Sequence, residues 1–363
     1  MKRIPIIAGL GLVTPLGSGV EENWCALLAG GFISNHARCS LDRTSPNRVH
    51  HLAIAAADEA IAEAHWNDAP GGAGLVVGTS KGAIDAWTRG TEQTQPPCLA
   101  SVAVALRAKL PLLDGGPSLT VSAACASGLH ALIRAAMMIR GGEAERVLVV
   151  AAEASVSPIF LGCFGRLGVL PPEGAGCRPF DRERSGFLMS EAAAAVCLEA
   201  ADADDAPRRG YATIERYALG GDATHLTSGD PDGTALRRLL KTVVAGRPVD
   251  LIHAHGTGTD LNDPVELAAF EDECVIADAP APVVYSHKGA LGHSLGASGL
   301  VSIVLSCLMH RRGVVLPNSR TRKPLPARGL RIHADAKTQA IGRSVIVAAG
   351  FGGPVGVISL LSA

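Results

Sequence analysis

Two spacings of hydrophobic residues alternate along the first half of this 363-residue chain. Short apolar, β-branched runs predict buried strands at residues 4–8, 74–78, 118–122 and 146–153. Apolar residues three and four positions apart predict helices at residues 20–28, 50–65 and 99–110, and a further helix after residue 126. This alternation is typical of an α/β fold whose parallel strands are joined by right-handed crossovers.

The second half repeats the same theme. It contains predicted strands at residues 250–255, 282–288, 344–349 and 355–361, and predicted helices at residues 264–273 and 300–310. The glycine-rich stretch 9–17 and the apolar stretch 158–172 read as loops, and residues 200–209, with acidic residues and a proline, read as a linker. We therefore expect a duplicated unit with halves at residues 1–204 and 205–363, although no strong sequence repeat is visible.

Composition narrows the class of protein. A hydrophobic content of 47% supports a large buried core, and a formal net charge of −1 argues against general binding to nucleic acid or to anionic membranes. No apolar run approaches the length of a membrane span, and Pro5, Gly9 and Gly11 interrupt the one near the start. The nine cysteines include no Cys-x-x-Cys pair and no zinc-type cluster, so we expect no metal and a reduced, cytoplasmic protein.

Cys125 lies between a predicted strand and a predicted helix, among the small residues Ala124, Ala126 and Gly128. At a helix N-terminus, unpaired N–H groups and the macrodipole favour a thiolate, and small neighbours leave room for a substrate. The same pattern also fits a small buried side chain, which is the usual role of a free cysteine. The local pattern leaves both interpretations open.

Two other strand ends share this format of small residues around one reactive side chain. His255 ends the strand at residues 250–255, and His293 follows the strand at residues 282–288, with Lys288 five residues before it. Since sites assemble at the strand ends of α/β sheets, we expect these side chains to meet near Cys125. The glycines at 9 and 11 fit a dinucleotide fingerprint poorly, because Thr14 and Pro15 replace its third glycine and helix start.

Seven ordered motifs together resemble the β-ketoacyl-acyl carrier protein synthases of the thiolase superfamily, in the class with a Cys-His-His triad. They are residues 9–17, 124–128, 178–191, 222–225, 255–259, Lys288 with 292–293, and 350–353. The resemblance implies a duplicated thiolase-like fold with five layers, α-β-α-β-α. It also implies a type II fatty acid, polyketide or polyene system, with substrates carried on the phosphopantetheine arm of an acyl carrier protein and no other cofactor.

The resemblance assigns roles to individual residues. Cys125 would accept an acyl group, and His255 and His293 would stabilise the enolate that forms when malonyl-thioester loses CO₂. Lys288 would tune and orient His293. The remaining assignments are the backbone N–H groups of Cys125 and Phe351 as the oxyanion hole, Thr257 and Thr259 as phosphopantetheine ligands, and Phe164 and Phe351 as the gate of the acyl pocket.

Other polar residues have structural interpretations. We expect Asp181, Glu191 and Asp222 to be structural, buried-pair candidates, and His253, His287 and His310 to be ordinary core histidines.

Several positions depart from the family pattern. Pro354-Val355 follows the glycine loop where the family usually has Thr-Asn, Ala348-Ala349 replace polar residues, and His287 replaces a threonine. The chain is also shorter between Gly82 and Pro117, where relatives build part of the dimer interface and pocket floor. We expect altered gating and an altered pocket, in a homodimer or in a heterodimer with another ketosynthase-fold subunit.

Two alternatives stay open. A chain-length-factor-like subunit, weakly active or non-catalytic, would share the fold, but such proteins lack the cysteine. An acyltransferase or thiolase-like enzyme would use Cys125 without decarboxylation, and the thiolase version needs a second cysteine near the C-terminal glycine loop, where the sequence has none after Cys307.

Overall fold

The computed structural model describes residues 3–41, 45, 47–88, 98–202 and 210–363. Ten of its strands form one sheet in the order β3-β2-β4-β5-β1-β6-β12-β11-β7-β8. Two further short strands, β9 (Val314–Val315) and β10 (Lys337–Thr338), pair with each other. Among the residues described, no helix is both long and apolar enough to cross a membrane.

The large sheet consists of two halves with the same internal order. The first half contains β1 (Ile4–Val13), β2 (Gly74–Gly78), β3 (Ser118–Val121), β4 (Arg146–Glu153) and β5 (Ala192–Ala201). The second half contains β6 (Ala212–Gly221), β7 (Leu251–His253), β8 (Val283–Tyr285), β11 (Arg343–Ala349) and β12 (Pro354–Ser362). The order 3-2-4-5-1 therefore corresponds to 8-7-11-12-6, as expected for a duplicated unit.

The halves join through a short antiparallel contact in which Ile6 and Ile7 of β1 face Thr213 and Ala212 of β6. Within each half, three strands run parallel, and the expected parallel arrangement holds only for these. Each half also has one strand of opposite direction: β5 pairs antiparallel with β4 and β1, and β12 pairs antiparallel with β6 and with β11, from which it returns through the tight loop 350–353. Tight returns of this kind join only antiparallel neighbours.

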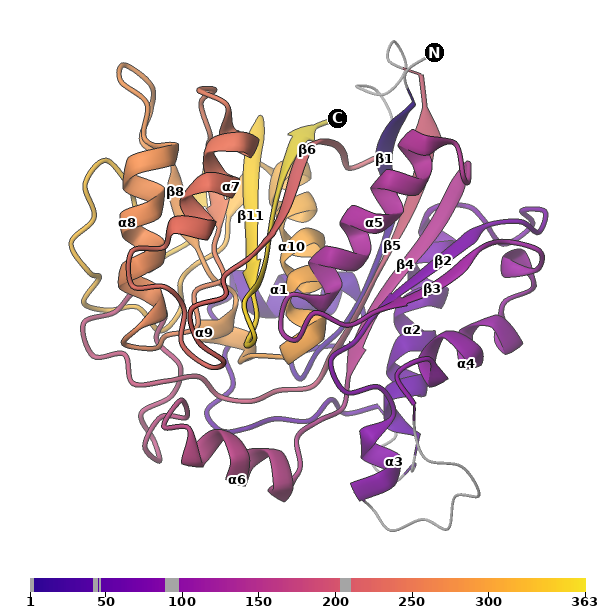
Figure 1. Ribbon diagram of the computed structural model, residues 1–363, viewed down its shortest axis with the longest axis horizontal. Coiled ribbons are helices and arrows are strands. Elements are labelled where there is room, and N and C mark those ends of the chain that lie inside the picture. Colours follow the sequence, from indigo (N-terminus) through magenta and orange to yellow (C-terminus); the bar gives the residue numbers. More distant parts are fainter. Residues whose placement is uncertain (1–2, 42–44, 46, 89–97, 203–209) are drawn as a thin grey trace.

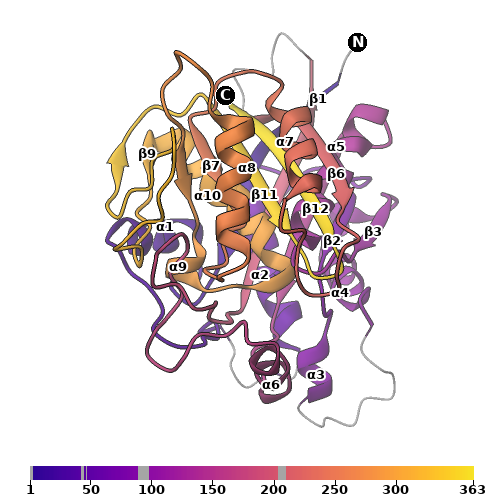
Figure 2. The ribbon, with the colours of Figure 1, turned by 60° about the vertical axis from the view of Figure 1, so that its left-hand side comes forward.

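Helices form three layers around the two half-sheets (Figures 1 and 2). The outer face of the first half is covered by α2 (Arg48–Glu63) and α4 (Ser101–Lys109), and that of the second half by α7 (Thr234–Val244) and α8 (Asn262–Cys274). Between the half-sheets lie α5 (Ser127–Gly141) and α10 (Ser298–Arg312). Residues 298–310 of α10 are all buried, which explains why this helix has no polar face. The five-layer prediction is confirmed.

Glycines bring the two central helices into close contact. A Cβ added at Gly128 in α5 would lie 2.9 Å from the Leu300 nitrogen, and one added at Gly299 in α10 would lie 2.9 Å from the Leu129 nitrogen. Because α5 follows the Cys125 loop and α10 follows the His293 loop, this contact sets the two loops side by side.

Three sequence predictions of local structure were wrong. The stretch 9–17 was expected as a loop, but β1 continues to Val13, because Gly9 and Gly11 allow α2 to pack on the strand: a Cβ at either would overlap an α2 carbonyl oxygen. The stretch 158–172 contains helix α6 (Pro158–Arg166), which begins with its proline in the first turn. The strand expected at 282–288 ends at Tyr285, and Lys288 begins the short helix α9 (Lys288–Leu291).

The remaining elements complete the path. Helix α1 (Val20–Leu28) is as predicted, and α3 (Ile84–Thr88) is a short helix in the shortened region, of which residues 89–97 lie outside the described residues. Most of the predicted linker, including the boundary at 204/205, also lies outside them. Helices α6 and α9 lie at the end of the molecule opposite the two chain termini (Figure 1).

Candidate active site

Cys125 lies in the turn between β3 and α5. The Ser127 hydroxyl holds this turn, since it accepts from the Ala123 N–H at 2.9 Å and donates to the Ala124 carbonyl at 2.6 Å. Ala124 has a φ of 47°, a left-handed conformation that is uncommon for a residue with a side chain. As a whole residue, Cys125 is half-buried in this turn. Strained backbone of this kind is frequently found at functional sites.

The protonation of Cys125 differs from the sequence-based expectation. Burial raises the pKa of the thiol to about 11, although the nearby positive charge of Lys288 acts to lower it. Glu153 raises this pKa further and Lys81 lowers it. Desolvation of the thiolate therefore outweighs the benefit expected from a helix N-terminus, and the resting residue is a thiol.

His255 and His293 lie together at the ends of two segments of the second half. Their ring centroids are 5.5 Å apart, with an interplanar angle of 82°. The His293 backbone donates to the Leu188 carbonyl at 2.7 Å and accepts from the Ser190 N–H at 3.1 Å, which fixes its loop. Within the described part of the chain, the buried His293 Nδ1 has no hydrogen-bond partner. The imidazole therefore has a nitrogen available for another molecule.

Two buried acids hold the loop that carries His255. Glu266 accepts from the N–H groups of His255 at 2.8 Å and Gly256 at 2.6 Å, and Asp263 accepts from the Gly258 N–H at 3.1 Å. Burial, together with the charge of Asp263, raises the pKa of Glu266 to about 7. The sequence analysis missed both residues. Their spacing of three on one face of a helix beside a glycine-rich loop was the available signal.

Lys288 is buried and donates its Nζ hydrogen bond to the His255 carbonyl oxygen. Burial lowers the pKa of Lys288 to about 8, an effect opposed by Glu266. Burial and the Lys288 charge together hold the pKa values of His255 and His293 well below the usual 6.5. Both imidazoles are therefore neutral near pH 7, and each has one N–H to donate. The only side-chain hydrogen bond described for Lys288 goes to the His255 segment and not to His293.

An aromatic series leads to His293. The ring centroids of Phe351 and Phe164 are 6.2 Å apart, those of Phe164 and Phe187 are 5.7 Å apart, and those of Phe187 and His293 are 4.9 Å apart. Cys125 packs against the same apolar cluster. The two predicted gate residues therefore lie together on the Cys125 side. Phe187 was missed because its motif, residues 178–191, was read only as a family marker.

The loop 350–353 packs on the nucleophile turn. A Cβ added at Gly350 would lie 2.8 Å from the Ala123 carbonyl oxygen and 3.0 Å from the Cys125 nitrogen. The N–H groups of Gly350, Gly352 and Gly353 all donate to backbone carbonyls. Among the hydrogen bonds of the described residues, none uses the N–H of Cys125 or Phe351 as donor. These are the two groups expected to form an oxyanion hole.

Thr257 and Thr259 share one loop and one contact. Their hydroxyl oxygens are 2.9 Å apart, Thr257 is buried and Thr259 is half-buried. The intervening Gly258 has a φ of 73°, which turns both hydroxyls to the same side. The Cys177 thiol donates to the Thr257 carbonyl at 3.4 Å. The pair can offer hydroxyl groups to a polar ligand such as an amide.

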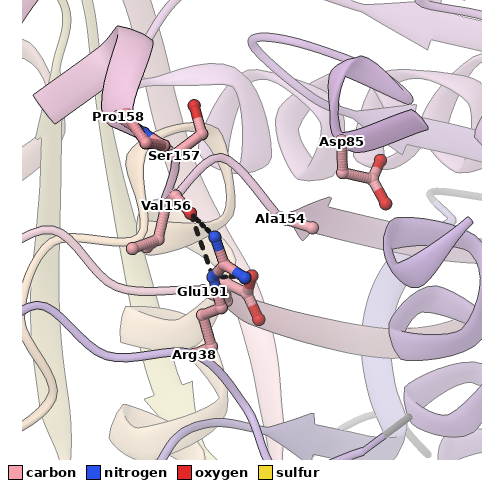
Figure 3. Close-up of a pocket in the computed structure, with 7 residues that line it drawn as sticks. All are labelled: Arg38, Asp85, Ala154, Val156, Ser157, Pro158 and Glu191. Atoms are coloured by element: carbon pink, nitrogen blue, oxygen red, sulfur yellow. Dashed lines mark hydrogen bonds and ion pairs between the residues drawn. The ribbon is translucent and has the colours of Figure 1, made fainter. Parts of the chain in front are cut away.

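A pocket of about 140 Å³ lies at the start of α6, away from the predicted site residues (Figure 3). Arg38 donates to the Val156 carbonyl at 3.0 and 2.6 Å and lies 3.9 Å from Glu191. These contacts, visible in Figure 3, hold the segment from which α6 extends. The contacts of Arg38 at this pocket thus help to position α6, which carries Phe164.

Of the three acids predicted to be structural, two are buried and one is not. Glu191 is buried and pairs with the buried Arg48, as predicted. Asp181 is also buried, and it accepts from the N–H groups of Glu183 at 2.8 Å and Arg322 at 2.6 Å. The prediction of a buried pair is wrong for Asp222, which is only half-buried and organises its own loop by accepting from Thr224 and Asp230.

Comparisons with known proteins show which sequences this chain is similar to. Residues 31–203 match the family "Beta-ketoacyl synthase, N-terminal domain" and residues 211–322 match "Beta-ketoacyl synthase, C-terminal domain". The chain is 30% identical to 3-oxoacyl-[acyl-carrier-protein] synthase 2 of Rhizobium meliloti, with 89% of this chain and 90% of the relative covered. It is 28% identical to a putative polyketide beta-ketoacyl synthase 1 of Streptomyces halstedii, with 97% and 96% covered.

Two solved structures are similar over 100% of both chains. One is a ketosynthase in complex with its type II PKS acyl-carrier protein and bound to the hexaketide, with a TM-score of 0.87 and 26% identity. The other is the ishigamide ketosynthase/chain length factor, with a TM-score of 0.87 and 25% identity.

Proposed function

This chain belongs to the β-ketoacyl synthase family, and we propose that it catalyses the decarboxylative Claisen condensation of malonyl-acyl carrier protein with an acyl chain bound to Cys125. The observation that carries the proposal is the meeting of two neutral imidazoles, 5.5 Å apart, beside the apolar cluster that includes Cys125. This arrangement offers a nucleophile and two N–H donors to one substrate.

In the first step, the Cys125 sulfur attacks the acyl thioester of the carrier protein. The thiol proton goes to the departing carrier thiolate, and the acyl group remains on sulfur. The N–H groups of Cys125 and Phe351, which donate to no acceptor among the described residues, are suited to bind the oxyanion of the tetrahedral intermediate. A thiol with a pKa of about 11 must lose its proton as the carbonyl is attacked, so oxyanion stabilisation matters for this step.

In the second step, malonyl-thioester loses CO₂, and the electron pair of the broken C–C bond becomes an enolate. His255 and His293 would each donate an N–H to the thioester oxygen on which the charge develops. The enolate carbon then attacks the acyl-cysteine carbonyl and displaces the Cys125 thiolate, which yields a 3-oxoacyl thioester. The thiolate takes up a proton from solvent, which restores the resting thiol. Neutral histidines suit this role, because a neutral imidazole donates an N–H hydrogen bond and, unlike an imidazolium, does not readily transfer that proton to the enolate.

The Thr257 and Thr259 hydroxyls would bind the amides of the phosphopantetheine arm, and Phe164 and Phe351 would control access to the acyl pocket. An acyl carrier protein is the proposed partner, in a cytoplasmic type II system with no further cofactor. A second ketosynthase-fold subunit, identical or not, would complete the assembly. The two similar solved structures support these partners, because one is a ketosynthase with its acyl-carrier protein and the other is a ketosynthase/chain length factor.

The second candidate is a chain-length-factor-like subunit, and one observation favours it. Pro354 begins β12 directly after the loop 350–353, and its ring restricts the backbone at the end of this loop, three residues after Phe351. A stiffened loop would slow the acylation of Cys125 unless a partner subunit moved it. The presence of Cys125 argues against a purely structural role.

We expect wild-type protein, mixed with acyl-carrier protein and malonyl-carrier protein, to gain an acyl mass and then release a 3-oxoacyl product. Intact-mass analysis measures both. Cys125→Ala should gain no mass, whereas His293→Ala should gain the acyl group but release no 3-oxoacyl product. Cys163→Ala removes an exposed cysteine and serves as the matched control, with wild-type behaviour expected.

Acylation of Cys125→Ala at the wild-type rate would refute the proposed nucleophile. Acylation of wild type only after a second ketosynthase-fold subunit is added would instead favour the subunit role.

A further inference from the structure

Two buried histidines beneath the site take no part in the steps above. The Nε2 of His253 lies 3.0 Å from the Nδ1 of His287. On the far sides, the His253 Nδ1 lies 3.0 Å from the Ser306 hydroxyl, and the His287 Nε2 lies 3.2 Å from the Ser298 hydroxyl. Both imidazoles are completely enclosed. A continuous series, Ser306-His253-His287-Ser298, therefore runs through the core.

The Ser302 backbone carbonyl acts to raise the pKa of His253, as an acceptor close to the ring does. Because the His253 Nδ1 faces α10, to which Ser302 belongs, we place the His253 proton on Nδ1. Its Nε2 must then accept from an Nδ1–H of His287. The His287 Nε2 in turn accepts from the Ser298 hydroxyl. Each neutral imidazole thus donates once and accepts once.

This series joins the three segments that carry the proposed catalytic histidines and lysine. His253 is two residues before His255, His287 immediately precedes Lys288, and Ser298 begins the helix that follows the His293 loop. Two other contacts tie only the first two segments: the Lys288 ammonium to the His255 carbonyl, and the Ser286 hydroxyl to the Gly256 carbonyl at 2.8 Å. Among these contacts, only the His253–His287 series also reaches the third segment, at Ser306 and Ser298 of α10.

We propose that His253 and His287 form a positioning pair that sets the spacing between His255 and His293. This inference rests on the proposed function, in which those two histidines must donate to one thioester oxygen. A misplacement of about 1 Å can cost as much as about a hundredfold in a positioned reaction. Cys125 and its turn belong to the other half of the molecule, so the pair acts on decarboxylation and not on acylation.

The charges around the pair support a neutral hydrogen-bonded state. Lys288 is the cation that faces both rings, and the imidazoles of His255 and His293 face His287. Burial and these neighbours hold the pKa values of His253 and His287 well below 6.5. A protonated ring would lose its acceptor nitrogen and break the series.

Substitutions at His287 separate its two contacts. His287→Asn retains an amide near the Nδ1 position and can still donate to His253. His287→Gln places its amide near the Nε2 position and can reach Ser298, and His287→Leu removes both contacts. His310→Leu is the matched control, because His310 is a buried histidine bonded to the Ser344 hydroxyl at 2.8 Å and lies outside this series.

Two half-reactions are measured separately: acyl transfer to Cys125, and formation of acetyl-carrier protein from malonyl-carrier protein. We expect His287→Leu to lower decarboxylation by about tenfold or more while acylation changes by less than about twofold. His287→Asn and His287→Gln, which each retain one of the two contacts, should each recover part of the loss, and His310→Leu should leave both rates near wild type. Equal losses in both half-reactions, no loss, or losses that follow Tm in all variants would overturn the proposal.

A second readout is independent of activity. In ¹⁵N-histidine-labelled protein, His287→Leu should shift the ring signals of His255 and His293, and His310→Leu should not. If wild type fails to decarboxylate, the proposed function fails, and these spectra still decide the positioning role. Unshifted His255 and His293 signals in His287→Leu would refute it.

Discussion

At the scale of single residues, the surroundings of Cys125, the proposed nucleophile, disfavour the thiolate form. Burial raises the pKa of Cys125 to about 11, and the cation that opposes this, Lys288, has its own pKa lowered to about 8. Above about pH 8, therefore, Lys288 loses the charge that favours the Cys125 thiolate. In the proposed reaction, the charge that develops on the substrate oxygen must therefore be stabilised by other groups, and the backbone N–H groups of the adjoining loops can do this.

This balance predicts the pH dependence of alkylation. Only the thiolate reacts with iodoacetamide, so modification of Cys125 should rise by up to about tenfold per pH unit from pH 7, and less steeply above pH 8. Mass mapping of the modified peptide separates Cys125 from the exposed Cys25, Cys98 and Cys163. A rate that levels off below pH 9 would contradict the buried-thiol picture.

The residues that could be predicted from sequence are those whose chemistry is unusual in its local setting. Cys125, His255, Lys288 and His293 each lie in a short glycine-rich motif. Glu266 could not be found this way. It accepts hydrogen bonds from backbone N–H groups of a loop that begins eleven residues earlier, and a glutamate on a helix has no distinctive sequence pattern of its own. Its function exists only once the loop has folded over it.

At the scale of elements, glycines had two roles that the sequence pattern did not separate. Gly9 and Gly11 were read as turn residues, although they lie in a strand where they admit a helix. Gly256 and Gly258 do adopt positive φ and were read correctly as a loop. Strand length was likewise misjudged near Lys288, because a buried apolar run of a few residues looks the same in a strand and in a short helix.

The loop 350–353 offers a test of element packing. Gly350→Ala should push this loop away from Ala123 and the Cys125 nitrogen, since the added Cβ would lie within 3.0 Å of both. We expect at least a tenfold loss of Cys125 acylation, comparable to the loss of an oxyanion donor, which is on the order of 10²-fold.

Gly221→Ala is the control for this prediction, because Gly221 pairs with Pro354 but has open space around its Cβ position. Circular dichroism should show both variants folded. Unchanged acylation in Gly350→Ala would show that the contact does not position the loop for catalysis.

At the scale of the whole molecule, the duplicated order of strands and helices could be predicted from the alternating pattern. The joining of the half-sheets could not, because the contact between β1 and β6 involves only two residue pairs and has no signature of its own. The antiparallel direction of β5 and β12 could not be predicted either, because the helical connections elsewhere in each half led to the expectation of parallel strands throughout. The boundary predicted at 204/205 remains a prediction.

Buried neutral histidines make the whole fold sensitive to acid. His253, His255, His287 and His293 have pKa values well below 6.5 in the folded protein, so the unfolded chain takes up more protons as the pH falls. Stability therefore decreases below about pH 6.5, by up to about 1.4 kcal/mol per pH unit for each histidine.

Glu266 acts in the opposite sense, because its raised pKa of about 7 makes the folded protein take up a proton first, but it offsets only about one histidine. We expect Tm to fall between pH 7 and pH 5, and to fall less steeply in His287→Asn. A Tm that is constant across this range would exclude four neutral buried imidazoles.

The contact between Gly128 and Gly299 also has a consequence for synthesis of the chain. The nucleophile turn is made first by the ribosome, and the segments that carry His255 and His293 follow more than a hundred residues later. The newly made first half contains Cys125 but neither His255 nor His293. These side chains come together only when α10 packs against α5. A partly synthesised chain therefore lacks the complete proposed site, and we expect condensing activity only after α10 has packed against α5.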